Sequence, residues 1–207
     1  LAPMQWRNWS GLESAVPTST LTPRSADEVV EAVVDARDTG GRVKMVGTGH
    51  SFTAIAAPVG VMLSPEGLTG IISVDRAADG SGTVTAYAGT RLKDLNAALE
   101  ALSLSLHNMG DIAEQTLAGA ISTGTHGTGG RVAGIAAQVV GLTLVDGNGA
   151  WWSRRPRRTP RSSTWRGSGW VRSASWRPSR SASSRSSGSR RSSSRCRGPS
   201  STAPSTT

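Results

Sequence analysis

The sequence has 207 residues and a formal net charge of +9 at pH 7, but its two parts differ sharply in composition. Residues 1–150 carry 9 Lys and Arg against 14 Asp and Glu, whereas residues 151–207 carry 14 Arg, no Lys and no acidic residue. The single cysteine, Cys196, excludes an intrachain disulfide and a cysteine-based zinc site. No apolar run approaches the ~18 residues of a membrane span, and Leu1 to Gly11 lack the apolar stretch of a signal peptide. We therefore expect a cytoplasmic protein.

Residues 1–150 alternate between helical and extended patterns. Valines at helical spacing predict a helix over about residues 25–39, with Ser25 or Thr22 as its cap and glycines at its end. Thr90 is expected to cap a second helix, in which the leucines at 92, 95, 99 and 102 form one stripe. Apolar runs predict strands over about residues 42–46, 61–63, 70–74, 83–88 and 138–145, the last followed by a turn at 146–149. These elements indicate an α+β fold.

Two glycine-rich loops are the strongest functional signal. The first, Gly47-Thr-Gly-His-Ser-Phe52, follows a predicted strand, and its backbone N–H groups can form a concave nest for phosphate oxygens. It is neither a Rossmann fingerprint, because Phe52 stands at the third glycine position, nor a P-loop, because no Gly-Lys-Ser/Thr occurs. The second loop, Ser122 to Gly130, lets the backbone approach a flat ligand. Each loop alone is also compatible with an ordinary turn, but the pair indicates a dinucleotide.

The three histidines do not indicate a metal site. His50 and His126 lie inside the glycine loops, and His107 is expected to be a hydrogen-bonded structural residue. No two of them have the i,i+4 spacing of a helical zinc site, so no metal ligands are expected.

At these loops the sequence resembles the FAD-linked oxidases of the vanillyl-alcohol oxidase type, which have a PCMH-type FAD-binding domain. Within them it is most similar to alditol oxidase and the aldonolactone oxidases, which act on D-arabinono-1,4-lactone or L-gulono-1,4-lactone. The resemblance spans nearly all of residues 4–149 and rests on Trp6-Arg-Asn-Trp-Ser-Gly11, Val46-Gly-Thr-Gly-His-Ser-Phe52 and Asn108-Met-Gly-Asp-Ile-Ala-Glu-Gln-Thr-Leu-Ala-Gly-Ala-Ile-Ser-Thr-Gly-Thr-His-Gly-Thr-Gly129. It implies two α/β subdomains over residues 1–150, incomplete at their C-terminal end, with the substrate domain and its catalytic residues absent.

The resemblance also implies which residues contact FAD. The loop that wraps the pyrophosphate matches Met45, Val46, Gly47, Thr48, Gly49, His50 and Ser51. The positions that line the flavin from the other side match Asp111, Thr116, Gly119, Thr123, Gly124, Thr125 and His126. His50 matches a histidine that many members bond covalently to the flavin 8α-methyl group.

The reaction implied by the resemblance is FAD-dependent oxidation of a sugar-derived lactone or alditol. A hydride passes from the substrate to flavin N5, and O2 or an electron carrier then reoxidises the flavin, while the protein supplies orientation and electrostatics. Peripheral membrane association also occurs in this family.

The tail, residues 151–207, is expected to be disordered. Ser and Arg make up 33 of its 57 residues, and it holds one Val but no Leu, Ile, Phe, Tyr or Met. These are residues that a GC-rich gene yields out of frame. When the reading frame is moved back by one base, Trp152 reads as valine. With suitable third bases, residues 165–181 then read Val-Ala-Arg-Val-Gly-Leu-Gly-Ala-Leu-Gly-Val-Val-Ala-Ser-Val-Thr-Leu, a run that resembles a motif of the family. We therefore expect a frameshift near residue 150.

Two other readings stay open at this point. The Arg/Ser tail with its interleaved Trp residues is compatible with nucleic-acid binding, although the acidic N-terminal part and the lack of a nucleic-acid motif before the tail argue against it. The chain is also compatible with a gene fragment that is inactive as printed. Neither reading conflicts with descent from a flavin oxidase.

Overall fold

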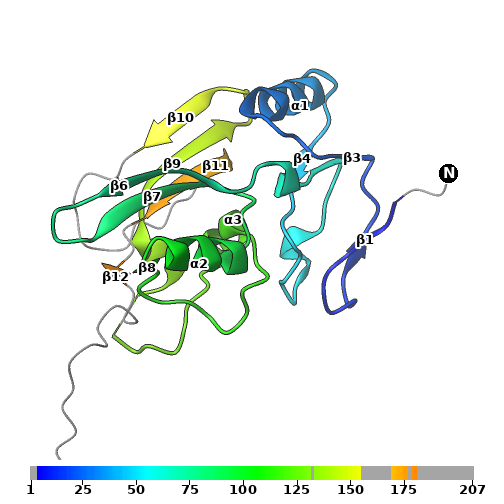
Figure 1. The fold of residues 1–207 in the computed structure, drawn as a ribbon. Helices are drawn as coiled ribbons and strands as arrows, with labels where there is room; N and C mark the ends of the chain where they lie inside the picture. Colours follow the sequence, from blue (N-terminus) through cyan, green and yellow to red (C-terminus); the bar gives the residue numbers. More distant parts are fainter. Residues whose placement is uncertain (1–3, 132, 155–168, 177–178, 181–207) are drawn as a thin grey trace, which may run out of the picture.

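Two sheets organise the residues that the computed structural model describes, which are 4–131, 133–154, 169–176 and 179–180 (Figure 1). A parallel sheet with the strand order β3-β5-β4 comprises Ser19–Leu21, Val61–Leu63 and Val43–Met45. An antiparallel sheet with the order β10-β9-β11-β7-β6 comprises Trp151–Arg154, Val139–Asp146, Gly169–Trp176, Gly82–Tyr87 and Ile71–Arg76. Two short pairs complete the pairing, β1 (Trp6–Arg7) with β2 (Ser14–Ala15) and β8 (Leu104–Ser105) with β12 (Ser179–Arg180).

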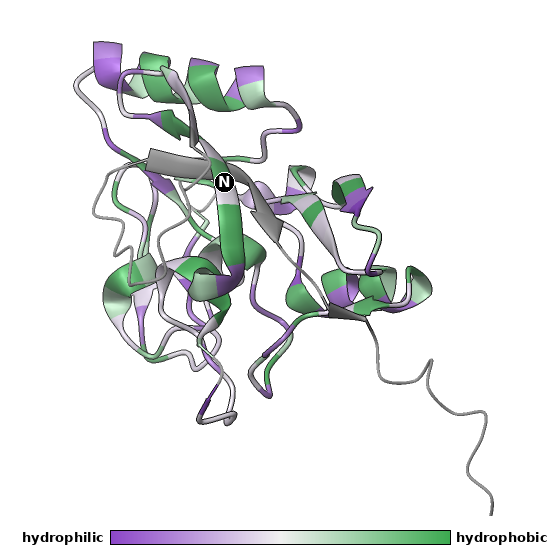
Figure 2. Ribbon diagram, turned by 90° about the vertical axis from the view of Figure 1, so that its left-hand side faces the viewer, coloured by the Kyte–Doolittle hydropathy of each residue, from purple (hydrophilic) through white to green (hydrophobic). Residues whose placement is uncertain are grey.

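Helix α1 (Ala26–Asp38) begins where the sequence predicts it. The Ser25 hydroxyl accepts a hydrogen bond from the Glu28 N–H at 3.1 Å, and Asp27 and Glu28 place negative charge at the positive end of the helix dipole. Hydrophobic and hydrophilic residues alternate around this helix, as Figure 2 shows. The apolar side supplies Val29 and Val33 to a core.

Each sheet has its own hydrophobic core. The first core joins α1 to the parallel sheet and to the end of β9, with Val33, Leu63 and Val145 at most 4% exposed. The second core lies between the antiparallel sheet and helices α2 (Leu92–Ala101) and α3 (Leu117–Ser122), and its buried members include Leu95 and Leu99. Three 3-10 turns lie between these elements, η1 (Ala54–Ala56), η2 (Pro65–Gly67) and η3 (Ile135–Gln138). The prediction of an α+β fold is confirmed.

The prediction that Thr90 caps α2 is wrong. The N-cap residue is Arg91, which makes no side-chain capping bond. Thr90 is instead 2% exposed, and its hydroxyl accepts a hydrogen bond from the Gly70 N–H at 2.9 Å. A threonine oxygen satisfies whichever buried donor lies nearest, and here the start of β6 is closer than the helix end.

Three segments of the tail that composition predicts to be disordered are strands. β10 continues directly from the turn at residues 146–149 and pairs with β9, while β11 pairs with both β9 and β7. The last segment is β12, which pairs with β8. The average composition of the tail does not reveal such short strands. β10 follows a tight turn and can therefore pair with the strand before it. β11 lies between two strand edges whose backbone groups need partners. The other residues from 155 to 207 lie outside the described part of the chain.

Candidate cofactor site

A cavity of about 250 Å³ lies between the loop that follows β4 and the segment that leads into α3. One wall is formed by residues 44, 45 and 47–51. The opposite wall is formed by residues 115, 116, 118, 119, 122 and 123. Pro65 and the turn at Ile55 and Ala56 complete the lining. Sites that enclose a drug-sized ligand measure about 300–1,000 Å³, so this cavity encloses part of a ligand as long as a dinucleotide.

The first glycine loop approaches the opposite wall closely. A Cβ atom on Gly47 would lie 2.3 Å from Thr116 Oγ1, so only glycine fits at this point. Gly49 has a φ of +69°, a conformation that side chains disfavour. Within the described residues, no acceptor pairs with the backbone N–H groups from Gly47 to Ser51. The loop therefore offers free donors beside a cavity, the arrangement that binds phosphate oxygens.

The β1–β2 hairpin is hydrogen-bonded to this loop. The Trp9 N–H donates to the Gly49 carbonyl at 3.2 Å, and the Asn8 side-chain amide donates to the Ser51 carbonyl at 2.9 Å. Asn8 is 4% exposed and also accepts a hydrogen bond from the Glu13 N–H at 3.0 Å. These bonds use carbonyl groups of the loop and do not involve its N–H groups.

The His50 imidazole is stacked on Trp9, with 5.6 Å between ring centroids and 12° between ring planes. His50 lines the cavity, and its Nδ1 atom is buried without a hydrogen-bond partner in the described structure. A second such atom, Gln115 Oε1, belongs to the opposite wall. Buried polar atoms in native proteins are nearly always paired, so these two atoms are available to pair with a ligand in the cavity.

The wall opposite the glycine loop is fixed by the start of α3. The Thr116 hydroxyl caps this helix by accepting a hydrogen bond from the Gly119 N–H at 3.3 Å. Thr116 is 1% exposed, so its hydroxyl and methyl group form a rigid surface against Gly47. Thr123, at the other end of the helix, also lines the cavity.

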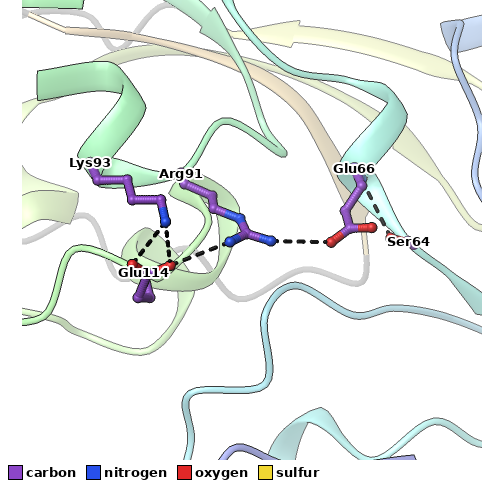
Figure 3. Close-up of polar contacts among 5 residues, drawn as sticks. All are labelled: Ser64, Glu66, Arg91, Lys93 and Glu114. Carbon is purple, nitrogen blue, oxygen red and sulfur yellow. Dashed lines mark hydrogen bonds and ion pairs between the residues drawn. The ribbon is translucent and has the colours of Figure 1, made fainter. Parts of the chain in front are cut away.

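Four charged side chains, Glu66, Arg91, Lys93 and Glu114, form a cluster (Figure 3), and two of them, Glu66 and Glu114, are the sequence neighbours of the lining residues Pro65 and Gln115. Lys93 donates to both carboxylate oxygens of Glu114 at 2.9 Å, and Arg91 bridges Glu114 at 3.3 Å and Glu66 at 3.4 Å. The Lys93 hydrogen bonds, followed by the charges of Lys93 and Arg91, hold the pKa of Glu114 below its ordinary value, although desolvation opposes this shift. Lys44 belongs to the cavity lining and makes no ion pair with a described residue.

The structure brings together most, but not all, of the residues that the sequence predicts for the site. Nine of them line the cavity: Met45, Gly47, Thr48, Gly49, His50, Ser51, Thr116, Gly119 and Thr123. Val46 does not line the cavity, because it is buried in the protein interior and only 3% exposed. Asp111 is exposed and lines no described cavity.

The second glycine loop forms a separate, more open hollow. Gly124 and His126 line this hollow together with neighbouring glycines of the loop. The Thr125 carbonyl accepts a hydrogen bond from the Ile135 N–H at 2.9 Å, which anchors the loop to η3. The His126 ring nitrogen Nδ1 lies 2.9 Å from the Gly127 carbonyl oxygen.

Three polar residues of the cavity, Lys44, Gln115 and Ser122, were not among the site residues predicted from the sequence. Lys44 lies in a three-residue strand, too short for alternation to show which face it takes. Gln115 lies inside a segment quoted for the family resemblance, but no residue-type rule assigns glutamine to a cofactor. Its unpaired oxygen becomes visible only in the structure.

A cavity walled by a donor-rich glycine loop, an unpaired imidazole and a helix start defines a nucleotide-cofactor domain. The family model described as an FAD binding domain matches residues 17–153, and the chain belongs to this family. FAD is therefore the cofactor of this domain. The residues present fit FAD, because its pyrophosphate needs donors and its hydroxyl and ring groups can pair with the two buried unpaired atoms.

The curated relatives are enzymes that act on sugar lactones. The chain is 39% identical over 144 residues to L-gulono-1,4-lactone dehydrogenase of Mycobacterium tuberculosis, and this match covers 70% of the chain and 33% of the relative. It is 39% identical over 145 residues to D-arabinono-1,4-lactone oxidase of Eremothecium gossypii, covering 70% and 27%. It is 36% identical over 146 residues to L-gulonolactone oxidase of Bos taurus, covering 70% and 32%. The chain thus spans about a third of the length of these relatives.

Solved structures share the fold. A solvent-stable cholesterol oxidase superposes with a TM-score of 0.68 at 26% identity, over 85% of this chain and 37% of that protein. A cholesterol oxidase from Brevibacterium sterolicum, a His121Ala mutant in its own numbering, superposes with a TM-score of 0.73 at 20% identity and the same coverage. The expected PCMH-type FAD-binding fold is confirmed.

Two further observations concern the described part of the chain. None of its helices combines the length and apolar character that a membrane crossing requires. It also contains no group of three or more His, Cys, Asp or Glu residues arranged to hold a metal ion.

Proposed function

We propose that this chain is the FAD-binding part of an oxidoreductase that oxidises a sugar-derived lactone or alditol. The observation that carries the proposal is the loop from Gly47 to Ser51, whose free N–H groups border a cavity with two unpaired buried polar atoms. The relatives that match at 36–39% identity are named for lactone substrates, and these names favour lactones over sterols. Because the relatives include a dehydrogenase and oxidases, the proposal covers O2 and other electron acceptors alike.

The proposed site consists of the two glycine loops and the start of α3. The first loop (Met45, Val46, Gly47, Thr48, Gly49, His50 and Ser51) is proposed to hold the pyrophosphate, with Val46 contributing through its backbone. Thr116, Gly119 and Thr123 of the facing wall are proposed to border the flavin, together with Asp111, Gly124, Thr125 and His126, which lie outside the described cavity. When bound, FAD supplies the two-electron acceptor for a hydride from the substrate. The role of this chain is to bind and orient the cofactor, while the residues that bind the substrate belong to the remaining length that the relatives have.

His50 is the proposed site of a covalent bond to the flavin. Its ring lines the cavity and is held by the stack on Trp9. Denaturing gel electrophoresis of the FAD-loaded protein tests this proposal, since flavin fluorescence should migrate with the polypeptide. Fluorescence found only in the small-molecule fraction contradicts the covalent bond and leaves FAD binding intact.

We propose that residues 1–150 form the FAD-binding domain and that residues 151–207 are a frameshift product. The family match ends at residue 153, close to the change in composition. The backbone of β11 pairs with β9 and β7, and its sequence is Gly-Trp-Val-Arg-Ser-Ala-Ser-Trp. In the shifted frame the same positions read Gly-Leu-Gly-Ala-Leu-Gly-Val-Val. Resequencing codons 145–160 tests this, and an unchanged read that matches related open reading frames contradicts it.

Substrate oxidation is tested on the protein made from a gene restored to the shifted frame. After mixing with L-gulono-1,4-lactone or D-arabinono-1,4-lactone without oxygen, the visible absorbance of the flavin should bleach. Cholesterol serves as the control because of the structural neighbours. Bleaching by cholesterol but by neither lactone contradicts the proposed substrate class. Nucleic-acid binding by the tail is not favoured, because the family match covers residues 17–153 and the relatives reported above are named as oxidases or a dehydrogenase.

A further inference from the structure

Gln115 is a cavity residue to which the sequence and the relatives' names give no role. Its side-chain oxygen Oε1 is buried and has no hydrogen-bond partner among the described residues. Its position is on the wall opposite the glycine loop, one residue before the helix cap Thr116. An unpaired amide oxygen in such a place is costly to bury unless a ligand completes it.

The backbone around Gln115 is fixed by the start of α2. The Leu92 N–H donates to the Gln115 carbonyl at 2.9 Å, and the Lys93 N–H donates to the Ala113 carbonyl at 2.9 Å. On the other side, the Leu117 N–H donates to the Thr90 carbonyl at 2.9 Å. The segment is thus tied to one helix end by three backbone bonds, which leaves little freedom for the main chain of Gln115.

The charged cluster in Figure 3 adds side-chain contacts to the same segment. Glu114, the neighbour of Gln115, is bonded to both Lys93 and Arg91. Arg91 also pairs with Glu66, which follows the cavity residue Pro65. The cluster therefore links the neighbours of two lining residues, Pro65 and Gln115, and restrains the chain on either side of the cavity.

We infer that Gln115 is a cofactor-binding residue whose side-chain oxygen accepts a hydrogen bond from a hydroxyl or N–H group of FAD. This inference rests on the proposed function. A carboxamide oxygen can only accept, and the pyrophosphate at neutral pH has no proton to donate. The partner is therefore a sugar-alcohol hydroxyl or a ring N–H group, which distinguishes this wall from the opposite glycine loop with its free N–H donors.

The experiment compares FAD affinity among variants of the full chain by fluorescence titration. Gln115→Leu removes the acceptor at similar volume, and Gln115→Glu keeps an acceptor oxygen. Gln5→Leu changes an exposed glutamine and is the matched control. Titrations in 0.3 M NaCl reduce the long-range repulsion between the new carboxylate and the phosphates, although charges inside the cavity are screened less than exposed ones. Circular dichroism establishes that each variant is folded.

We expect Gln115→Leu to weaken FAD binding roughly five- to tenfold, Gln115→Glu to weaken it less, and Gln5→Leu to leave it unchanged. Equal affinity of Gln115→Leu and the wild type overturns the inference while the proposed function stands. A folded wild-type chain that does not bind FAD overturns the proposed function and this inference together.

Discussion

The indole of Trp9 lies nearly parallel to the imidazole of His50, with 12° between their planes and 5.6 Å between their centroids. The two residues come from different elements: Trp9 follows β1, and His50 belongs to the loop after β4. The Trp9 N–H also donates to the carbonyl of Gly49, so one residue fixes both the loop backbone and the imidazole ring. The N-terminal hairpin therefore supports the loop that lines the cavity, although the family match begins only at residue 17.

Replacing Trp9 with alanine should loosen His50 and weaken FAD binding. Aromatic pairs contribute about 0.5–1.5 kcal/mol beyond the area they bury, which corresponds to roughly a two- to tenfold loss of affinity. Trp9→Phe keeps an aromatic ring and should retain most of the affinity. Fluorescence titration with FAD measures both variants, and an alanine variant that binds like the wild type would show that the stack has no role.

Lys44 should contribute to FAD binding through its charge. It lines the cavity and makes no ion pair with a described residue, whereas Arg91 and Lys93 are paired with glutamates. A charge-assisted hydrogen bond to phosphate contributes about 1.5–3 kcal/mol, so Lys44→Met should weaken binding by roughly tenfold or more at low salt.

The Lys44 effect should shrink as the NaCl concentration rises, because salt screens partly exposed charges. Arg24→Met, which changes an exposed cation away from the cavity, is the control and should have no effect. A salt-independent loss in Lys44→Met would point to packing and not to charge.

Gly47→Ala should destabilise the protein or abolish FAD binding. The new methyl group would lie 2.3 Å from Thr116 Oγ1, and Thr116 is buried and cannot retreat easily. Overpacking of this kind typically costs about 1–3 kcal/mol. The matched control is Gly147→Ala in the turn between β9 and β10, where nothing lies within 4 Å of the new Cβ and which lines neither cavity. Urea denaturation compares the two free energies of unfolding, and equal values in both variants would refute the close approach of the two walls.

Stability should fall at acidic pH in part through Glu114. Its pKa is lowered in the folded state, first by the Lys93 hydrogen bonds. The carboxylate therefore stabilises the fold above the unfolded-state pKa of about 4.3, and this contribution is lost as the pH falls through the lower folded-state pKa. Thermal unfolding of the wild type and Glu114→Gln should show midpoints that converge as the pH is lowered below 4. A constant difference between them down to the most acidic pH would contradict this assignment.

Local patterns in the sequence predict much of the fold because they reflect local chemistry. Ser25 with Glu28 three residues later indicates a helix start, and the capping bond forms as expected. The glycine loop after β4 is predictable for the same reason, since a short strand followed by glycines leaves few conformations. The predicted Thr90 cap is wrong because the partner of the Thr90 hydroxyl depends on tertiary structure. In the fold this hydroxyl pairs with Gly70 and not with the helix end.

The site is less predictable than the fold because its walls are far apart in the sequence. Gly47 meets Thr116, and Asn8 meets Ser51, through contacts that no local pattern encodes. Val46 was expected at the site because it lies inside the matched loop, yet in a strand end adjacent side chains face opposite directions. Its side chain therefore lies in the interior while its neighbours line the cavity.

The central claim is that this chain binds FAD at the cavity between Gly47 and Thr116. Titration of the purified full chain with FAD, followed by flavin fluorescence and by circular dichroism in the visible region, tests it most directly. The account predicts saturable binding of one FAD per chain, lost in Gly47→Ala and retained in Gly147→Ala. A folded chain that leaves the flavin fluorescence unchanged at every FAD concentration, or that binds FAD equally well in both variants, would contradict it.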